Sequence, residues 1–127
     1  MTQLGSILLA STDPQRLRDW YAAALEPDVD NDQEGYRVLG FGGFYVMIDT
    51  RDDIGPANPE PGRIILNFHV RDAQAVVDRL EQLGATWIAK LDDRDGSRFA
   101  TVADPDGNYV QVIELSEAHL AEMGVGS

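Results

Sequence analysis

The stretch that decides the fold is Asp104-Pro105-Asp106-Gly107-Asn108-Tyr109-Val110. Aspartate and glycine in this arrangement are typical of a tight turn between two antiparallel strands. Strand-like runs lie on both sides of it, at 98–103 and 109–115. An earlier segment, Gly43-Phe44-Tyr45-Val46, is similar to Gly107-Asn108-Tyr109-Val110. The chain therefore reads as two copies of one unit, each ending with the same kind of strand.

Each half also contains one helix. Asp13-Pro14 is a good helix start, because Asp caps the first turn and Pro has no N–H to lose there. In the second half Asp72 is the predicted cap and Gly84 the terminating residue; Asp13 and Asp72 lie 59 residues apart. Strand-like runs occur at the same places in both halves, at 6–12, 28–32, 36–41 and 44–50 and again at 64–70, 86–91, 98–103 and 109–115.

These patterns predict an α+β fold of two tandem βαβββ modules that form a cup-shaped mixed sheet. We place module one at 1–54, a linker rich in Pro and Gly at 55–62, module two at 63–115 and a short helix at 116–123. One half alone would bury too little apolar surface to be stable, so we expect both modules to pack into a single domain over 1–127.

The composition narrows the range of partners. The chain has 127 residues, a net charge of −12 and no cysteine. Such a charge repels phosphate backbones and favours cationic ligands, so we expect no nucleic-acid partner. The absence of cysteine excludes disulfides and thiolate metal sites. With no apolar run long enough for a membrane span or a signal peptide, we expect a cytoplasmic protein without a membrane partner.

The duplicated module and its Asp-Pro-Asp-Gly-Asn turn resemble the vicinal oxygen chelate superfamily. That superfamily includes glyoxalase I, extradiol dioxygenases and the fosfomycin and bleomycin resistance proteins. The similarity covers essentially the whole chain and also rests on Asp13-Pro14 with Trp20-Tyr21 and on Val70-Arg71-Asp72. It implies a sheet that lines a cup, and most members of the superfamily form pairs, so we expect a homodimer.

The resemblance also implies where a metal would be held. Metal-dependent members use four side chains, two near the starts of the modules' first strands and two on their last strands. The equivalent positions here are Ser6, Ile65, Met47 and Gln111. Divalent ions need several oxygen or nitrogen donors, and this set contains neither His nor carboxylate. A small register shift would bring in Asp49 or Asn67 but would not complete the set. We therefore expect no metal and no other cofactor.

Strand alternation predicts the residues that face the cup. They are Tyr45, Met47, Asn67, His69, Tyr109 and Gln111, which we take as candidate ligand-binding residues. His69 is the candidate general base, since its ordinary pKa lies near 6.5; the alternative is a histidine that only hydrogen-bonds its neighbours. Asn67 could likewise orient a ligand or be a satisfied polar residue, the two tyrosines could pack on the sheet, and Met47 could fill a gap. His119 is expected to be solvated.

Three functions remain open. The first is a metal-free protein that binds a small, cationic or aromatic compound, as bleomycin resistance proteins do. The second is an enzyme (a lyase, isomerase or dioxygenase) with an atypical or metal-free site, and the third is a structural or regulatory protein. The acidic run at 92–96 does not match a calcium loop and is expected to be a solvated turn, and Gly40-Phe41-Gly42-Gly43 is expected to be a hairpin rather than a phosphate loop.

Overall fold

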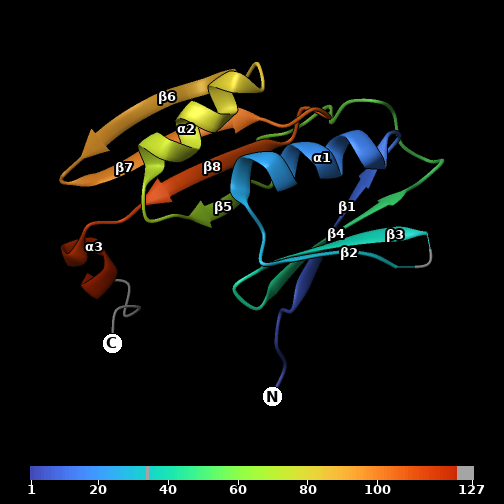
Figure 1. Ribbon diagram of the computed structural model, residues 1–127, viewed down its shortest axis with the longest axis horizontal. Helices are drawn as coiled ribbons and strands as arrows, with labels where there is room; N and C mark the ends of the chain where they lie inside the picture. The colour runs from blue at the N-terminus through green and yellow to red at the C-terminus, as the bar shows by residue number, and fades with distance from the viewer. Residues whose placement is uncertain (34, 123–127) are drawn as a thin grey trace. The chain divides into compact units, whose positions relative to one another are not determined.

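The computed structural model describes residues 1–33 and 35–122. Figure 1 shows two groups of strands, each with a helix against it. The chain divides into two compact units, Met1–Asn58 and Pro59–Ser127, and the boundary falls inside the segment 55–62. Each unit has the order βαβββ, and a short third helix follows the second unit. The predicted α+β fold of two tandem modules is therefore confirmed.

Unit 1 is a four-stranded mixed sheet with one helix. In the strand order β1-β4-β3-β2, β1 runs parallel to β4 and the other neighbours are antiparallel. In the register Leu8 lies opposite Met47, and Ser6 lies opposite Tyr45. The elements of this unit are β1 (Ser6–Ser11), α1 (Pro14–Leu25), β2 (Val29–Gln33), β3 (Tyr36–Phe41) and β4 (Phe44–Thr50).

The helix of unit 1 begins as its sequence predicts. The Asp13 carboxylate accepts a hydrogen bond from the backbone N–H of Arg16 at 3.2 Å, and Pro14 is the first helical residue. One side of α1 is fully buried, as are side chains on one face of β3 and β4, so helix and sheet share a core. The buried residues are Leu17, Tyr21, Ala24, Leu39, Val46 and Ile48.

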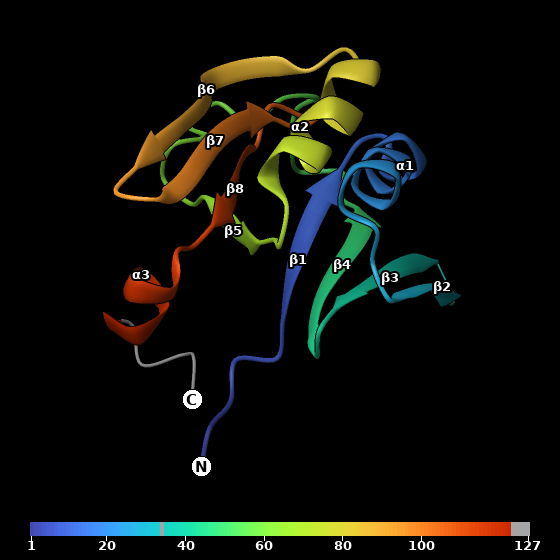
Figure 2. The ribbon, with the colours of Figure 1, turned by 60° about the vertical axis from the view of Figure 1, so that its left-hand side comes forward.

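Unit 2 repeats this plan in the strand order β5-β8-β7-β6. β5 is parallel to β8, and β6–β7 and β7–β8 are antiparallel; the long β6–β7 hairpin can be followed in Figure 2. The helix packs its Ala73, Val76, Val77 and Leu80 face on buried Ala100, Val102, Val110 and Val112. The elements are β5 (Leu66–His69), α2 (Ala73–Gln82), β6 (Thr86–Arg94), β7 (Ser97–Ala103), β8 (Tyr109–Glu114) and α3 (Glu117–Glu122).

Two of the predicted segments differ from the structure. The acidic run 92–96 is exposed, as predicted, but most of it is not a turn, because β6 continues to Arg94. Only Asp95 and Gly96 form the turn, with φ values of 54° and 87°, which is the backbone that a two-residue Asp-Gly hairpin needs. β5 is shorter than the run 64–70. The end of the helix predicted at 116–123 lies outside the described residues.

No helix in the described part of the chain is long and apolar enough to cross a membrane. The turn 104–108 is a hydrogen-bonded loop between β7 and β8, as the sequence predicts. The Asp104 side chain lies inside it, 4% exposed, and accepts hydrogen bonds from the backbone N–H groups of Asp106 and Asn108.

Candidate functional site

The face of the unit 2 sheet opposite α2 carries the polar residues. Residues that pair across the sheet lie on the same face. Gln111 pairs with Asn67 on β5 and with Thr101 on β7, and Thr101 pairs in turn with Ala89 on β6. These four residues therefore form one row across the sheet. Three of them, Asn67, Gln111 and Thr101, are polar, and we call these three the polar row. Val110 and Val112, its neighbours on β8, face α2 and are fully buried.

A hollow of about 390 Å³ lies over part of this face. Two residues of the polar row, Thr101 and Gln111, contribute a hydroxyl and an amide to its wall. Apolar groups come from Phe99, Leu91 and Ala89, so the wall combines apolar surface with polar and charged groups. The remaining lining residues are Lys90, Asp92, Arg94 and Ala100.

Two of the charged lining residues neutralise each other. The Arg94 guanidinium lies 3.3 Å from an Asp92 carboxylate oxygen. The same guanidinium carbon stands 5.8 Å from the centre of the Phe99 ring, a cation–π distance. Arg94 therefore covers an aromatic wall of the hollow, while its charge is balanced by Asp92.

Of the residues predicted to bind a ligand, Gln111 alone is among the described residues that line this hollow. Asn67 is exposed beside it in the polar row. His69 is exposed opposite Ile113, two residues farther along β5. Tyr109 is half-buried at the start of β8. The structure thus brings these four residues of module two onto one sheet face.

The two predicted residues of module one lie on the corresponding face of unit 1. Tyr45 is 39% exposed, and Met47 is half-buried two residues along β4. Their neighbours on β1 are Ser6 and Leu8. Leu8 is 50% exposed, so this face carries an exposed apolar side chain.

The residues at the metal-ligand positions do not fit a divalent ion. Met47 has the hydrocarbon side chain of Leu8 opposite it, and Ser6 lies two residues away beside Tyr45. Ile65 precedes β5, and its side chain has no donor atom. Gln111 is flanked by amide and hydroxyl groups. Within residues 1–33 and 35–122, no group of three or more His, Asp or Glu side chains could hold a metal ion.

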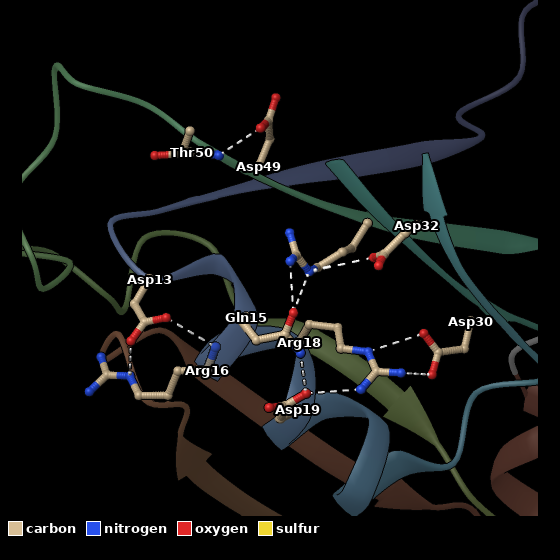
Figure 3. Close-up of polar contacts among 10 residues, drawn as sticks. Asp13, Gln15, Arg16, Arg18, Asp19, Asp30, Asp32, Asp49 and Thr50 are labelled. Carbon is tan, nitrogen blue, oxygen red and sulfur yellow. Dashed lines mark hydrogen bonds and ion pairs between the residues drawn. The ribbon is translucent and has the colours of Figure 1, made fainter. Parts of the chain in front are cut away.

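Unit 1 has a second hollow, of about 300 Å³, lined by Gln15, Arg18, Asp30 and Asp32. In Figure 3 Arg18 is paired with Asp30, while Gln15 and Asp32 both contact the Arg37 guanidinium, at 2.7 Å and 3.6 Å. Arg18 donates to Asp19 at 2.9 Å and is paired with Asp30 on β2, and its hydrogen bonds to these two carboxylates raise the pKa of Arg18. Because its charged groups already have partners, this network serves to join α1 to β2.

Most residues that line the hollow were not predicted from the sequence. Lys90, Leu91, Phe99 and Thr101 line the hollow although none was predicted to do so; alternation along β7 would have placed Phe99 and Thr101 beside Gln111 once the Asp95-Gly96 hairpin was recognised.

The prediction that His119 is solvated was wrong. Its ring Nδ1 hydrogen-bonds to the hydroxyl of Ser97, which is fully buried and also accepts the backbone N–H of Ser116 at 2.8 Å. These bonds fasten α3 to the start of β7.

Comparison with known proteins places this architecture in a family. A model of the glyoxalase-like domain matches residues 6–113. A glyoxalase-related enzyme from Fulvimarina pelagi is 21% identical with a TM-score of 0.71, and the alignment covers 91% of this chain and 89% of that one. A glyoxalase/bleomycin resistance protein/dioxygenase family enzyme from Burkholderia phytofirmans PsJN is 15% identical with a TM-score of 0.73, covering 91% and 100%.

The oxidase ChaP-H2 is 19% identical with a TM-score of 0.73, covering 91% of this chain and 95% of that one. At these identities the solved structures share the fold with this chain. A search of curated proteins found no match. The family match and the repeated βαβββ order agree with the resemblance that the Asp-Pro-Asp-Gly-Asn turn indicates. The chain therefore belongs to the glyoxalase-like domain family, within the vicinal oxygen chelate superfamily.

Proposed function

We propose that this protein binds a small organic molecule without a metal ion, in the manner of the drug-binding bleomycin resistance proteins. The observation that carries the proposal is the hollow of about 390 Å³ on the sheet face of unit 2 opposite α2, where Gln111 and Thr101 lie beside apolar groups of Phe99, Leu91 and Ala89. The mismatch between the metal-ligand positions and any divalent ion supports it. A ligand bound there would be oriented by the amide and the hydroxyl and would contact the Phe99 ring.

The net charge of the whole chain attracts or repels ligands before they reach the hollow. A net charge of −12 draws cationic compounds to the surface at low ionic strength. The groups that line the hollow then decide which compounds are retained. A ligand screen should therefore contain acidic, neutral and basic aromatic compounds.

The test is a titration followed by amide chemical shifts, using a fragment set of that composition. We expect saturable shifts at Ala89, Phe99, Thr101 and Gln111. Ala89→Phe would fill the hollow and should abolish binding. Ile88→Phe is the matched control, because Ile88 is also exposed on β6 but is not among the lining residues. If no fragment shifts these resonances, or if Ala89→Phe binds as the unaltered protein does, the proposal is wrong.

An enzyme is the second candidate, favoured by the exposed position of His69 on the same sheet face. An imidazole there could take a proton from a ligand held by Asn67 and Gln111. Compounds found in the screen should be incubated with the protein and checked for products by mass spectrometry. Product that disappears in His69→Ala, with binding retained, would establish this role; unchanged ligands would reject it.

We also propose a cytoplasmic homodimer. The proposal is supported by the pairing common in the superfamily and by a sequence without cysteine. Sedimentation velocity over a range of protein concentrations tests the assembly, since a dimer sediments faster than a single chain. A species that stays at the monomer mass at every concentration would contradict it.

A further inference from the structure

The edge strand β6 is irregular beside the hollow. From Trp87 to Asp92, β6 advances five residues, whereas its partner β7 advances three, from Val102 to Phe99. Two extra residues are therefore inserted into β6 over this stretch. Such bulges bend a strand and turn its side chains toward new directions. Lys90 lies within the bulged segment and lines the hollow.

Lys90 is the single lysine of the chain, and no described carboxylate pairs with it. Four arginines, by contrast, each have an acidic partner: Arg18, Arg37, Arg51 and Arg63. The nearest acidic residues along β6 are otherwise engaged: Asp92 pairs with Arg94, and Asp93 accepts the backbone N–H of Gly96 at 3.0 Å. The ammonium group is therefore the uncompensated charge of the hollow.

From these observations we infer that the hollow takes an organic carboxylate with an aromatic or otherwise flat apolar body. The ammonium of Lys90 would pair with the carboxylate, an interaction of opposite charges assisted by hydrogen bonding. Phe99, Leu91 and Ala89 would contact the apolar body, and Thr101 and Gln111 would bind its other polar atoms. The inference rests on the proposed function, since it names the ligand class of the same site.

The lysine and the bulge on the edge strand β6 also have an alternative explanation. Both discourage an exposed edge from pairing with a second sheet, and β6 is an edge of its sheet. This explanation requires no ligand. It predicts that removing the charge promotes association of the protein and leaves binding to the hollow unchanged.

The experiment compares two isosteric probes, 1-naphthoate and 1-naphthamide, in amide-shift titrations at low salt. The unaltered chain should bind 1-naphthoate more tightly than 1-naphthamide. In Lys90→Gln the affinity for 1-naphthoate should fall about fivefold, the upper range for an exposed ion pair, while that for 1-naphthamide stays unchanged. Arg71→Gln is the matched control, because it removes one exposed positive charge from unit 2 outside the hollow. Its affinity for either probe should change less than twofold.

The outcomes separate this inference from the proposed function. The inference is wrong if both variants weaken 1-naphthoate equally, because only net charge would then matter. It is also wrong if 1-naphthamide binds the unaltered chain as tightly as 1-naphthoate, or if Lys90→Gln associates without losing affinity. In each of these cases the hollow still binds a small molecule. If neither probe and no member of the fragment set binds, the proposed function itself is wrong.

Discussion

The Asp104 carboxylate should be worth more stability than a turn aspartate normally is. Its Oδ1 accepts hydrogen bonds from the backbone N–H groups of Asp106 at 2.9 Å and Asn108 at 3.0 Å. Its Oδ2 accepts from the Asn108 side-chain amide at 2.8 Å. Asp104 and Asp106 are both nearly inaccessible to water, 4% and 5% exposed. Solvent therefore cannot readily replace the carboxylate when it is removed.

The magnitude follows from the three bonds. A hydrogen bond contributes about 1 kcal/mol net, and more when one partner is charged or when a buried donor is left unpaired. Asp104→Ala should therefore lower the free energy of unfolding by about 3 to 4 kcal/mol. Asp104→Asn keeps one oxygen for the two backbone donors but turns a donor toward the Asn108 amide. We expect that variant to lose about 1 to 2 kcal/mol.

Urea unfolding followed by circular dichroism measures these differences. Asp52→Ala is the control, because Asp52 is an exposed aspartate in the segment after β4 and should change stability by less than about 0.5 kcal/mol. A loss for Asp104→Ala no larger than for Asp52→Ala would refute the reasoning. The turn would then be held by its backbone and its glycine alone.

Three further predictions concern other parts of the molecule. Protein purified without chelator or nickel resin should contain far less than one metal ion per chain by elemental mass spectrometry; near-stoichiometric metal would contradict the assigned ligand positions. Ser97→Ala should speed amide hydrogen exchange across α3, because the hydroxyl that binds His119 and the backbone N–H of Ser116 is lost; unchanged exchange would show that α3 is held otherwise. The hydrogen bond from Arg51 lowers the pKa of Asp53, so Arg51→Gln should raise that pKa toward its ordinary value in an NMR titration. A group whose pKa is lower in the folded than in the unfolded chain stabilises the folded state at pH values above its unfolded pKa, and this contribution is lost as the pH falls through the folded pKa. Because Arg51 and Asp53 are both exposed, we expect no measurable change in the free energy of unfolding.

Much of the fold could be predicted because its signals are local. Asp13 and Asp72 cap their helices through their own side chains, as their positions before the apolar stripes indicate. The strands 36–41 and 44–50 begin and end where predicted. Alternation also identified the open face that carries Asn67 and Gln111. These features depend on residues a few positions apart, and each residue type favours a particular backbone conformation or position in a helix or strand.

The candidate site was predicted less completely, because it depends on strands that meet only in the sheet. Gln111 follows from the family resemblance and from strand alternation, but the hollow beside it is built mostly from β6 and β7. The acidic run at 92–94 looks like a loop in the sequence and becomes a strand because β7 supplies its hydrogen-bonding partners. His119 is not solvated as predicted, because its ring hydrogen-bonds to the buried hydroxyl of Ser97, 22 residues earlier in the chain.

Local sequence signals are enough to establish the two repeated modules, the helix starts and the closing turn. Tertiary structure alone decided the register that sets Leu8 against Met47 and Asn67 against Gln111. It also decided the bulge in β6 that contains Lys90, one of the residues that line the hollow. The physical reason is that caps and turns satisfy hydrogen bonds within a few residues, whereas register and bulges are settled by partners elsewhere in the chain.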